Sequence, residues 1–297
     1  MTKCGYIAIA GQPNVGKSTL INGLMKKKVA IISEKPETTR DAICGILTEG
    51  DSQMIFIDTP GIHKPKNLLG KIMTTQARSS VLEADIILFL IEKRAAFTRE
   101  DMNIISLLPE KKDKKTVILI INKTDRIKDK PSLLPLMEKA ARLYPFDEIV
   151  PMSALDQKHI DALHSLITKY LPEKDHIFAS DKITDRDEDF MTKEIIREKI
   201  LIESYDEVPH SVAVTIDQKN DEGTIIRIHA TIIVERESQK TIIIGKNGSM
   251  IKKIGTSARR ELEKLLNKRV YLDLWVKPVK DWKKDTEALR DVGYISG

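Results

Sequence analysis

The stretch GQPNVGKS, residues 11 to 18, decides the fold of the first half of this chain. It follows the apolar run YIAIA at residues 6 to 10 and precedes the helix-like STLINGLM at residues 18 to 25. A strand, a loop with two glycines and a helix in this order form a phosphate-binding loop, in which backbone N–H groups and the positive helix end surround an anion. The stretch therefore predicts a nucleotide-binding α/β domain with a wound, mostly parallel sheet covered by helices on both faces.

Seven residues of this loop are predicted to contact the nucleotide. Lys17 is expected to neutralise charge between the β and γ phosphates, which makes it a predicted catalytic residue. The hydroxyl of Ser18 suits a Mg²⁺ ligand. The complete predicted set is Gly11, Asn14, Val15, Gly16, Lys17, Ser18 and Thr19.

Two further motifs follow apolar runs and predict a base site. TVILII at residues 116 to 121 leads into Asn122, Lys123, Thr124 and Asp125. The carboxylate of Asp125 can accept hydrogen bonds from the N1–H and 2-amino group of guanine, and adenine lacks both donors. The predicted ligand is therefore GTP or GDP, and Asp125 argues against the alternative of an ATPase.

The run EIVPM at residues 148 to 152 leads to the second part of the base site, Ser153, Ala154 and Leu155. The backbone N–H of Ala154 is predicted to meet guanine O6. Alone, this triplet is an ordinary helix-entry turn, and it is its position after the other motifs that favours a base site.

A magnesium site and two nucleotide-sensitive loops are predicted between these motifs. MIFID at residues 54 to 58 ends in Asp58, whose carboxylate can hold Mg²⁺ through water, and the Gly61 amide can touch the γ-phosphate. The polar segment SEKPETTRDAI at residues 33 to 43 is expected to be a mobile loop. Thr39 is the predicted Mg²⁺ hydroxyl of this loop, with Thr38 as its competitor. Thr39 and Gly61 join Lys17 as predicted catalytic residues.

Ile62 stands where a Ras-type switch places a glutamine that orients the attacking water. Because its side chain forms no hydrogen bond, we expect slow intrinsic hydrolysis, with water positioned by a backbone group, a monovalent cation or a partner. His63 is a weaker candidate for the base, since a lone loop histidine is more often a surface residue. An RNA-binding adaptor that holds GTP only structurally remains an alternative.

The second half of the chain predicts a different, α+β domain. After Leu171 and Pro172, the segment EKDHIFASDKITDRDEDF at residues 173 to 190 has few apolar residues and predicts a linker. A helix, two strands, two helices and a strand follow, and GKNG at residues 245 to 248 lies between the paired helices. Two glycines flanking two polar residues let a backbone approach a sugar-phosphate chain, as in a KH domain. The predicted domains are residues 1–172 and 191–297, joined by the linker at 173–190.

Basic charge is concentrated in this second domain. Residues 240 to 284 carry thirteen Lys or Arg and four Asp or Glu, a net of +9, whereas the chain totals +5 and its remainder therefore carries −4. Such a concentration attracts phosphates. The predicted RNA-binding residues are Gly245, Lys246, Asn247, Gly248, Ile251, Lys252 and Lys253.

The apolar residues of this domain carry three further expectations. Ile243, Ile244, Ile251 and Ile254 are expected to form an apolar floor under the bases as well as to fill the core. Trp275 is predicted to be a core residue of the last strand, and Trp282 a terminal anchor.

Composition excludes several classes of protein. With 297 residues, 41% apolar and 31% charged, the chain can bury ordinary cores in about two domains. The longest apolar runs, such as IILFLI at residues 86 to 91, are too short to span a bilayer. The short stretch before the first strand leaves no room for a signal peptide, and Cys4 and Cys44 offer no disulfide framework, so a cytoplasmic protein is expected.

Over nearly the whole chain, these motifs resemble the Era family of TrmE-Era-EngA-YihA-Septin-like, translation-factor-related GTPases. GQPNVGKST, PETTRD, DTPGIHKPK and NKTD carry the resemblance in the first half, and IIIGKNGSMIKKIG, RVYLDLWVK and DWKKDTEALRDVGY in the second. The resemblance implies an Era-type G domain followed by a type II KH domain, with Mg²⁺-dependent GTP hydrolysis. It also implies binding of single-stranded, 16S-type ribosomal RNA near its 3′ end, and a role in maturation of the small ribosomal subunit from its precursor.

The resemblance implies finer properties too. Asn14 is implied as a K⁺ ligand, as in relatives with an apolar residue at the Ile62 position; simple loop geometry is an equal alternative, since asparagine tolerates unusual dihedrals. Asn247 stands where many relatives carry glycine. The family implies peripheral association with the cytoplasmic face of the inner membrane, and we expect a monomer. Related GTPases with two tandem nucleotide domains are a less suitable match, since this chain has one phosphate loop.

Overall fold

The computed structural model describes residues 1–33, 35, 37–61, 65, 67–94, 96–110, 113–204 and 208–295, with the backbone alone at 209 and 210. The chain divides into two compact units. Unit 1 comprises Met1–Ile32, Thr39–Lys64 and Lys71–Asp185, and unit 2 comprises Ser33–Thr38, Pro65–Gly70 and Arg186–Gly297. Ser33–Thr38, which lies in the predicted loop at residues 33 to 43, and Pro65–Gly70 thus belong to unit 2, whereas the predicted domain boundaries assign both to the first domain.

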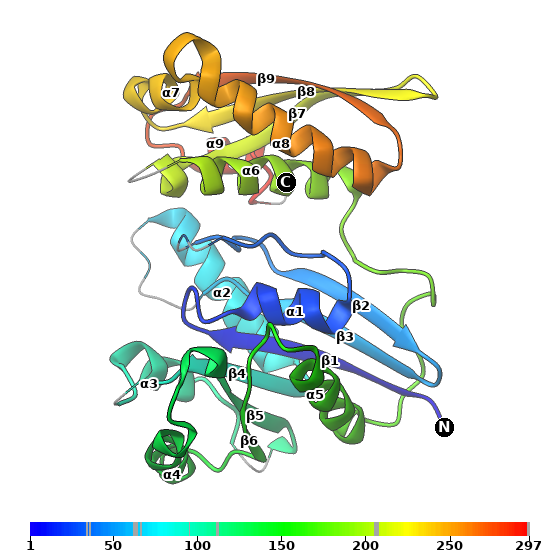
Figure 1. Ribbon diagram of the computed structural model, residues 1–297, viewed down its shortest axis with the longest axis vertical. Helices are drawn as coiled ribbons and strands as arrows, with labels where there is room; N and C mark the ends of the chain where they lie inside the picture. The colour runs from blue at the N-terminus through cyan, green and yellow to red at the C-terminus, as the bar shows by residue number, and fades with distance from the viewer. Residues whose placement is uncertain are drawn as a thin grey trace. The chain divides into compact units, whose positions relative to one another are not determined.

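Unit 1 is built on a six-stranded sheet of order β2-β3-β1-β4-β5-β6 (Figure 1). Only β2 runs antiparallel to its neighbour, so the predicted mostly parallel sheet is confirmed. The strands are β1 (Lys3–Gly11), β2 (Ile43–Glu49), β3 (Ser52–Asp58), β4 (Ile86–Glu92), β5 (Thr116–Asn122) and β6 (Glu148–Pro151). The helices are α1 (Lys17–Met25), α2 (Leu68–Glu83), α3 (Arg99–Ile105), α4 (Leu134–Leu143) and α5 (Gln157–Tyr170).

Helices cover both faces of this sheet, which explains why its central strands are continuous apolar runs. One core joins α1 and α5 to one face, with Leu20, Leu24 and Leu163 among its buried residues. The other core joins α2, α3 and α4 to the opposite face, around Phe89 and Leu119. The loops that follow β1, β3, β5 and β6 leave the sheet at the carboxyl ends of its strands, where ligands bind in wound α/β sheets.

Part of the segment predicted as a linker is bound to unit 1. Gln53 of β3 is fully buried, and its Oε1 accepts hydrogen bonds from the backbone N–H groups of Ile177 (2.8 Å) and Phe178 (3.0 Å). Its Nε2 donates to the Phe178 carbonyl at 2.8 Å and to Thr48 Oγ1 at 3.0 Å. The side-chain amide of Gln53 therefore makes the hydrogen bonds to the backbone of residues 177 and 178 that a neighbouring strand would otherwise make.

Unit 2 contains a three-stranded sheet of order β7-β8-β9, with β7 and β8 antiparallel and β8 and β9 parallel (Figure 1). Its elements are α6 (Glu188–Glu203), β7 (Ala213–Asp221), β8 (Ile225–Val234), α7 (Glu237–Ile244), α8 (Ser249–Leu266), β9 (Arg269–Pro278) and α9 (Thr286–Asp291). Up to β9, their order is the predicted helix, strand, strand, helix, helix, strand. Alternate residues of β8 pack with α6, α7 and α8 in a single core.

Of the expectations about apolar residues of unit 2, the one for Trp275 is wrong and the one for the isoleucines is right only in part. Trp275 is 67% exposed, because it pairs with Thr231 of β8, and both residues point away from the face that packs against the helices. Ile243 and Ile254 fill the core, as expected, but their full burial leaves neither available as a floor for bases. Ile244 and Ile251 are half-buried, and for them the floor stays a prediction. Trp282 is fully buried, and its Nε1 donates to the Ser211 carbonyl at 3.0 Å.

Within the described residues, no helix combines the length and apolar character needed to cross a membrane. Cys4 and Cys44 are both present as thiols.

Candidate functional site

The phosphate-binding loop lies between β1 and α1, and Lys17 opens that helix. The side chain of Lys17 is buried, and its Nζ donates to the carbonyls of Gly11 (3.1 Å) and Gln12 (2.9 Å). Burial lowers the pKa of Lys17 from 10.5 to about 8, against the opposing effect of the negative charge of Asp58. Asn14 has a φ of 64°, a left-handed conformation that supports the loop-geometry interpretation of this residue; its K⁺ role stays a prediction.

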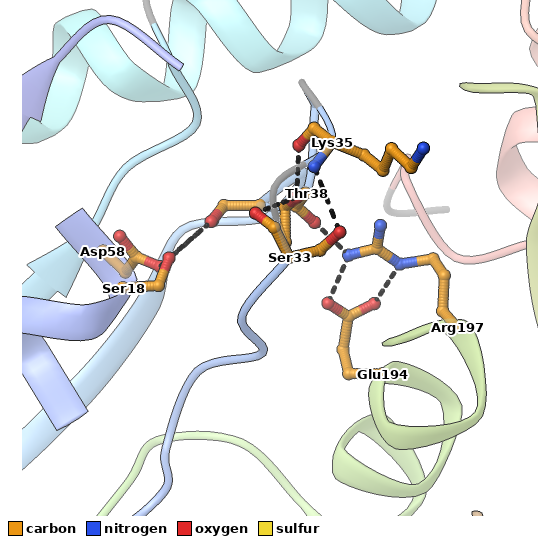
Figure 2. A network of polar contacts seen from close by, with 8 residues as sticks. Ser18, Ser33, Lys35, Thr38, Asp58, Glu194 and Arg197 are labelled. Carbon is orange, nitrogen blue, oxygen red and sulfur yellow. Dashed lines mark hydrogen bonds and ion pairs between the residues drawn. The ribbon is translucent and has the colours of Figure 1, made fainter. Parts of the chain in front are cut away.

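Three oxygen-bearing side chains converge beside this loop. Ser18 Oγ donates to Asp58 Oδ2 at 2.9 Å, and Figure 2 shows the two side chains next to each other. Thr39 Oγ1 donates to the same oxygen at 3.1 Å, and the two hydroxyls lie 3.1 Å apart. Hydroxyl and carboxylate oxygens are hard ligands of the kind that Mg²⁺ prefers beside substrate phosphates, so this set fits the predicted ion. The Thr38 hydroxyl instead donates to the Lys35 carbonyl at 2.5 Å. Of the two competing threonines, Thr39 is therefore the one that faces Ser18 and Asp58.

The loop after β3 lies directly against the phosphate loop. A Cβ added at Gly61 would meet Pro13 Cγ at 2.8 Å and Pro13 Cδ at 2.9 Å, closer than real Cβ atoms approach. Only a glycine fits at this position without moving Pro13. The predictions for Ile62 and His63 lie outside the described residues.

Asn122 connects the phosphate loop with the Ser153-Ala154-Leu155 turn. It is almost fully buried; its Nδ2 donates to the Val15 carbonyl at 2.8 Å, and its Oδ1 accepts from the Ala154 N–H at 2.9 Å. The Ala154 N–H, which is predicted to meet guanine O6, thus donates its hydrogen bond to Asn122 in this structure. A Cβ at Gly16 would lie 2.3 Å from Asn122 Nδ2, so a glycine is needed at this close approach.

Asp125 is exposed, as a residue that reads a base must be. Its Oδ1 accepts a hydrogen bond from Ser153 Oγ at 2.5 Å, which orients the carboxylate. Lys123 Nζ donates to the Asn14 carbonyl at 2.6 Å and forms an ion pair with Glu92. Leu155 is 78% exposed. The structure therefore gathers the predicted phosphate, magnesium and base residues at one edge of the sheet.

In unit 2, an arginine that the sequence analysis missed holds the backbone beside Thr39. Arg197 Nη2 of α6 donates to the Thr38 carbonyl (Figure 2). Glu194 orients this guanidinium through Nε–Oε1 and Nη2–Oε2 bonds of 2.7 and 2.5 Å, and the Arg197 side chain is 1% exposed. No sequence signal identifies this contact, because the two residues are 159 positions apart.

The predicted RNA-binding residues form the loop between α7 and α8 and the first turns of α8. Gly245, Asn247 and Gly248 have φ values of 72°, 52° and 73°. The side chains of Lys246, Asn247 and Lys252 are exposed, and Ile251 is half-buried. Lys253 forms an ion pair with Glu203 at 2.5 Å, so part of its charge is already compensated. The exposed apolar residue of α7 is Ile242, which the sequence analysis did not name.

Two family models match the chain, one in each half. The model described as 50S ribosome-binding GTPase matches residues 6–123, and the model described as KH domain matches residues 207–283.

Relatives and solved structures match over almost the whole length. GTPase Era of Nitrosomonas eutropha is 47% identical over 293 residues, covering 98% of each chain, and GTPase Era of Pseudomonas syringae pv. tomato is 45% identical over 99% of this chain and 97% of its own. A crystal structure of Era in complex with MgGDPNP and nucleotides 1506–1542 of 16S ribosomal RNA has a TM-score of 0.95 at 43% identity, covering 100% of both chains. A single-residue variant of Aquifex aeolicus Era bound to GDP.AlF4⁻ has a TM-score of 0.94 at 43% identity, covering 99% of this chain and 100% of its own. This chain therefore belongs to the Era family and is a GTPase with a carboxyl-terminal KH domain.

Proposed function

We propose that this chain is a GTP-hydrolysing switch that binds single-stranded small-subunit ribosomal RNA near its 3′ end and acts in assembly of that subunit. The observation that carries the proposal is the full-length similarity to an Era structure in complex with MgGDPNP and nucleotides 1506–1542 of 16S ribosomal RNA. The boundaries at residues 172 and 190 and the roles of the individual site residues are parts of this proposal.

For the nucleotide, the proposal assigns phosphate binding to the loop at residues 11–19 and charge neutralisation to Lys17. Ser18, Thr39 and Asp58 would hold Mg²⁺, which when bound neutralises charge on the β and γ phosphates. Asp125, oriented by Ser153, would read guanine, and Asn122 would hold the base loop against the phosphate loop. Gly61 would present its N–H to the γ-phosphate from its position against Pro13.

For the switch, two contacts of unit 2 support coupling between nucleotide and RNA. Arg197 holds the Thr38 carbonyl, and the Leu69 N–H donates to the Lys283 carbonyl at 3.2 Å. Thr38 lies within one predicted nucleotide-sensitive loop, and Leu69 follows the other along the chain. A bound nucleotide that brings Thr39 to Mg²⁺ would therefore act on the residue next to Thr38, which Arg197 of α6 holds. Coupling between nucleotide affinity and RNA affinity must operate in both directions.

For RNA, the exposed Lys246, Asn247 and Lys252 around the glycine loop would hold the sugar-phosphate backbone. Lys253 would contribute less, because Glu203 already pairs with it. The thiols of Cys4 and Cys44 support a cytoplasmic location, and peripheral contact with the inner membrane is a further part of the proposal.

Fluorescence anisotropy with a labelled single-stranded RNA of the 3′-terminal small-subunit sequence tests this proposal. We expect this RNA to bind more tightly than a scrambled RNA, and its affinity to change by about fivefold or more between GTP-analogue and GDP states. The double variant Lys246→Ala, Lys252→Ala should weaken binding and reduce the salt dependence by about two phosphate contacts. Lys139→Ala, at an exposed lysine of α4, is the control and should have no effect. Equal affinity for both RNAs would contradict the RNA assignment, and equal affinity in all nucleotide states would contradict the switch.

A further inference from the structure

A compact polar cluster lies behind the opening turn of the phosphate loop, outside the predicted contacts to the nucleotide. Its members are Gln12, Arg94, Thr98 and Asp101, contributed by the phosphate loop, the segment after β4 and the start of α3. Gln12 Nε2 donates to Thr98 Oγ1 at 2.5 Å and to Asp101 Oδ1 at 2.7 Å. Arg94 Nη1 donates to Gln12 Oε1 at 3.1 Å. Both ends of the Gln12 amide are therefore bound.

The chemistry of the neighbours determines the orientation of this amide. A guanidinium only donates hydrogen bonds and a carboxylate only accepts them, so the Gln12 oxygen must face Arg94 and its nitrogen must face Asp101. Asp101 is 1% exposed, and its Oδ2 also accepts from the Thr98 N–H at 2.9 Å in the N-terminal cap of α3. Thr98 Oγ1 donates to the same oxygen at 3.0 Å, and Arg94 Nη1 forms an ion pair with it at 3.5 Å. Because the donors surround a buried carboxylate, displacement of any one of them weakens the compensation of its charge, which favours a single arrangement of the cluster.

The backbone of the same residue carries this arrangement to the reacting groups. The Gln12 carbonyl accepts a hydrogen bond from Lys17 Nζ at 2.9 Å. The next residue, Pro13, is the one against which Gly61 packs. Gln12 therefore lies between a rigid helix cap and two residues, Lys17 and Gly61, that are assigned to the γ-phosphate side of the site.

We propose that Gln12 is a positioning residue for GTP hydrolysis, whose side chain fixes the opening turn of the phosphate loop to the cap of α3 and thereby sets Lys17 and Gly61. This inference rests on the nucleotide site proposed above. In the proposed site, the base and the remaining phosphate contacts are assigned to residues 14–16, 18, 19 and 122–155. Loss of the anchor should therefore slow turnover, while affinity for GDP stays close to that of the parent protein.

A donor and acceptor exchange between Gln12 and Asp101 tests the proposal. Gln12→Glu places a carboxylate against Asp101, and Asp101→Asn places an amide N–H₂ against either Gln12 or the Thr98 N–H. Each single variant should lower kcat for GTP about tenfold, within the range expected for a small misplacement of catalytic groups, with the Kd for GDP changed less than about threefold. In the double variant, the amide introduced at position 101 again accepts from Thr98 and donates to residue 12, and Arg94 again donates to residue 12. This exchange should restore most of the lost kcat.

Glu100→Gln is the matched control, because it makes the same carboxylate-to-amide change at the exposed neighbouring position of α3. Its kcat should equal that of the parent protein. The inference is overturned if the single variants keep full kcat, if they lose GDP affinity and thermal stability in the same proportion as kcat, or if the double variant is no faster than the single ones. Failure of the parent protein to bind GTP would instead contradict the proposed function, so the two failures are distinguishable.

Discussion

Lys17 shows how burial prepares one residue for a phosphate. Its ammonium group has been removed from water, and backbone carbonyls of Gly11 and Gln12 are its hydrogen-bond acceptors at 3.1 and 2.9 Å. Partial dipoles compensate the lost hydration only incompletely, which is why its pKa lies at about 8 rather than 10.5. A polyphosphate supplies the full negative charge that the carbonyls lack, so a bound nucleotide must raise this pKa.

The first prediction is a pH dependence of nucleotide affinity with a definite sign. The bound nucleotide favours the charged form of Lys17. At a pH at which Lys17 of the ligand-free protein is deprotonated, nucleotide binding is therefore accompanied by uptake of a proton. Affinity for GDP should be flat between about pH 6.5 and about 7.5, and should then fall, approaching about tenfold per pH unit above the ligand-free pKa of about 8.

Calorimetric titration of GDP at a series of pH values up to about 9 measures this effect. Lys17→Met is the control; it should bind more weakly and lack the additional decrease, whereas the ionisation of guanine itself affects both proteins alike. Parallel pH profiles for the two proteins would refute the assignment to Lys17.

At the scale of elements, strand ends position the site and buried amides hold the loops. Asp58 ends β3 and Asn122 ends β5, so two residues of the site lie where loops leave the same edge of the sheet. Asn122 and Gln53 both use one amide to hold two segments: Asn122 joins Val15 to Ala154, and Gln53 holds the backbone at residues 177 and 178. An amide suits this task because it donates and accepts at the same time.

The second prediction concerns Gln53, whose removal should cost stability rather than chemistry. Gln53→Leu leaves the N–H groups of Ile177 and Phe178 and the Phe178 carbonyl without their present partner. The free energy of unfolding should fall by about 2–4 kcal/mol, the cost of unsatisfied buried polar groups. Urea denaturation followed by circular dichroism measures this change. Gln157→Leu, which removes one surface bond to Asp161, should stay within about 0.5 kcal/mol of the parent, and an equal loss in both variants would argue against a special role for the buried amide.

At the scale of the whole molecule, the division into units does not follow the order of the chain. Ser33–Thr38 and Pro65–Gly70 belong with Arg186–Gly297, although unit 1 contains the residues on either side of each segment. The peptide bond between Thr38 and Thr39 is thus a boundary between the two units, with the Arg197 contact on one side and the Ser18 and Asp58 contacts on the other.

The third prediction is that Arg197 carries part of the coupling between nucleotide and RNA. Arg197→Met removes the donor to the Thr38 carbonyl and should bring the ratio of RNA affinities in the GTP-analogue and GDP states towards one, from a coupling of about 1–3 kcal/mol. RNA affinity without nucleotide should change little, because the glycine loop lies between α7 and α8. Anisotropy titrations in the three nucleotide states give these values.

Arg227→Met is the matched control for that experiment. It removes an arginine of the same unit that pairs with Glu222 and has no described contact to residues 33–38. A normal ratio in Arg197→Met, or an equal loss in Arg227→Met, would show that coupling uses other contacts.

The mostly parallel sheet, the positions of the four nucleotide motifs and the element order of the KH unit could all be predicted, because each depends on spacing and apolar period within a short stretch of chain. The exposed Trp275 and the bond from Ala154 to Asn122 could not, because each depends on which distant residue faces it. The sequence favours Thr39 over Thr38, and the structure adds that Thr39 faces Ser18 and Asp58. Trp275 is exposed through its pairing with Thr231, a register that no local pattern specifies. The contacts of Arg197 with Thr38 and of Gln12 with Asp101 join residues 159 and 89 positions apart. Motifs are local and can be recognised in the sequence, whereas the contacts that orient and couple them form only when packing brings remote segments together.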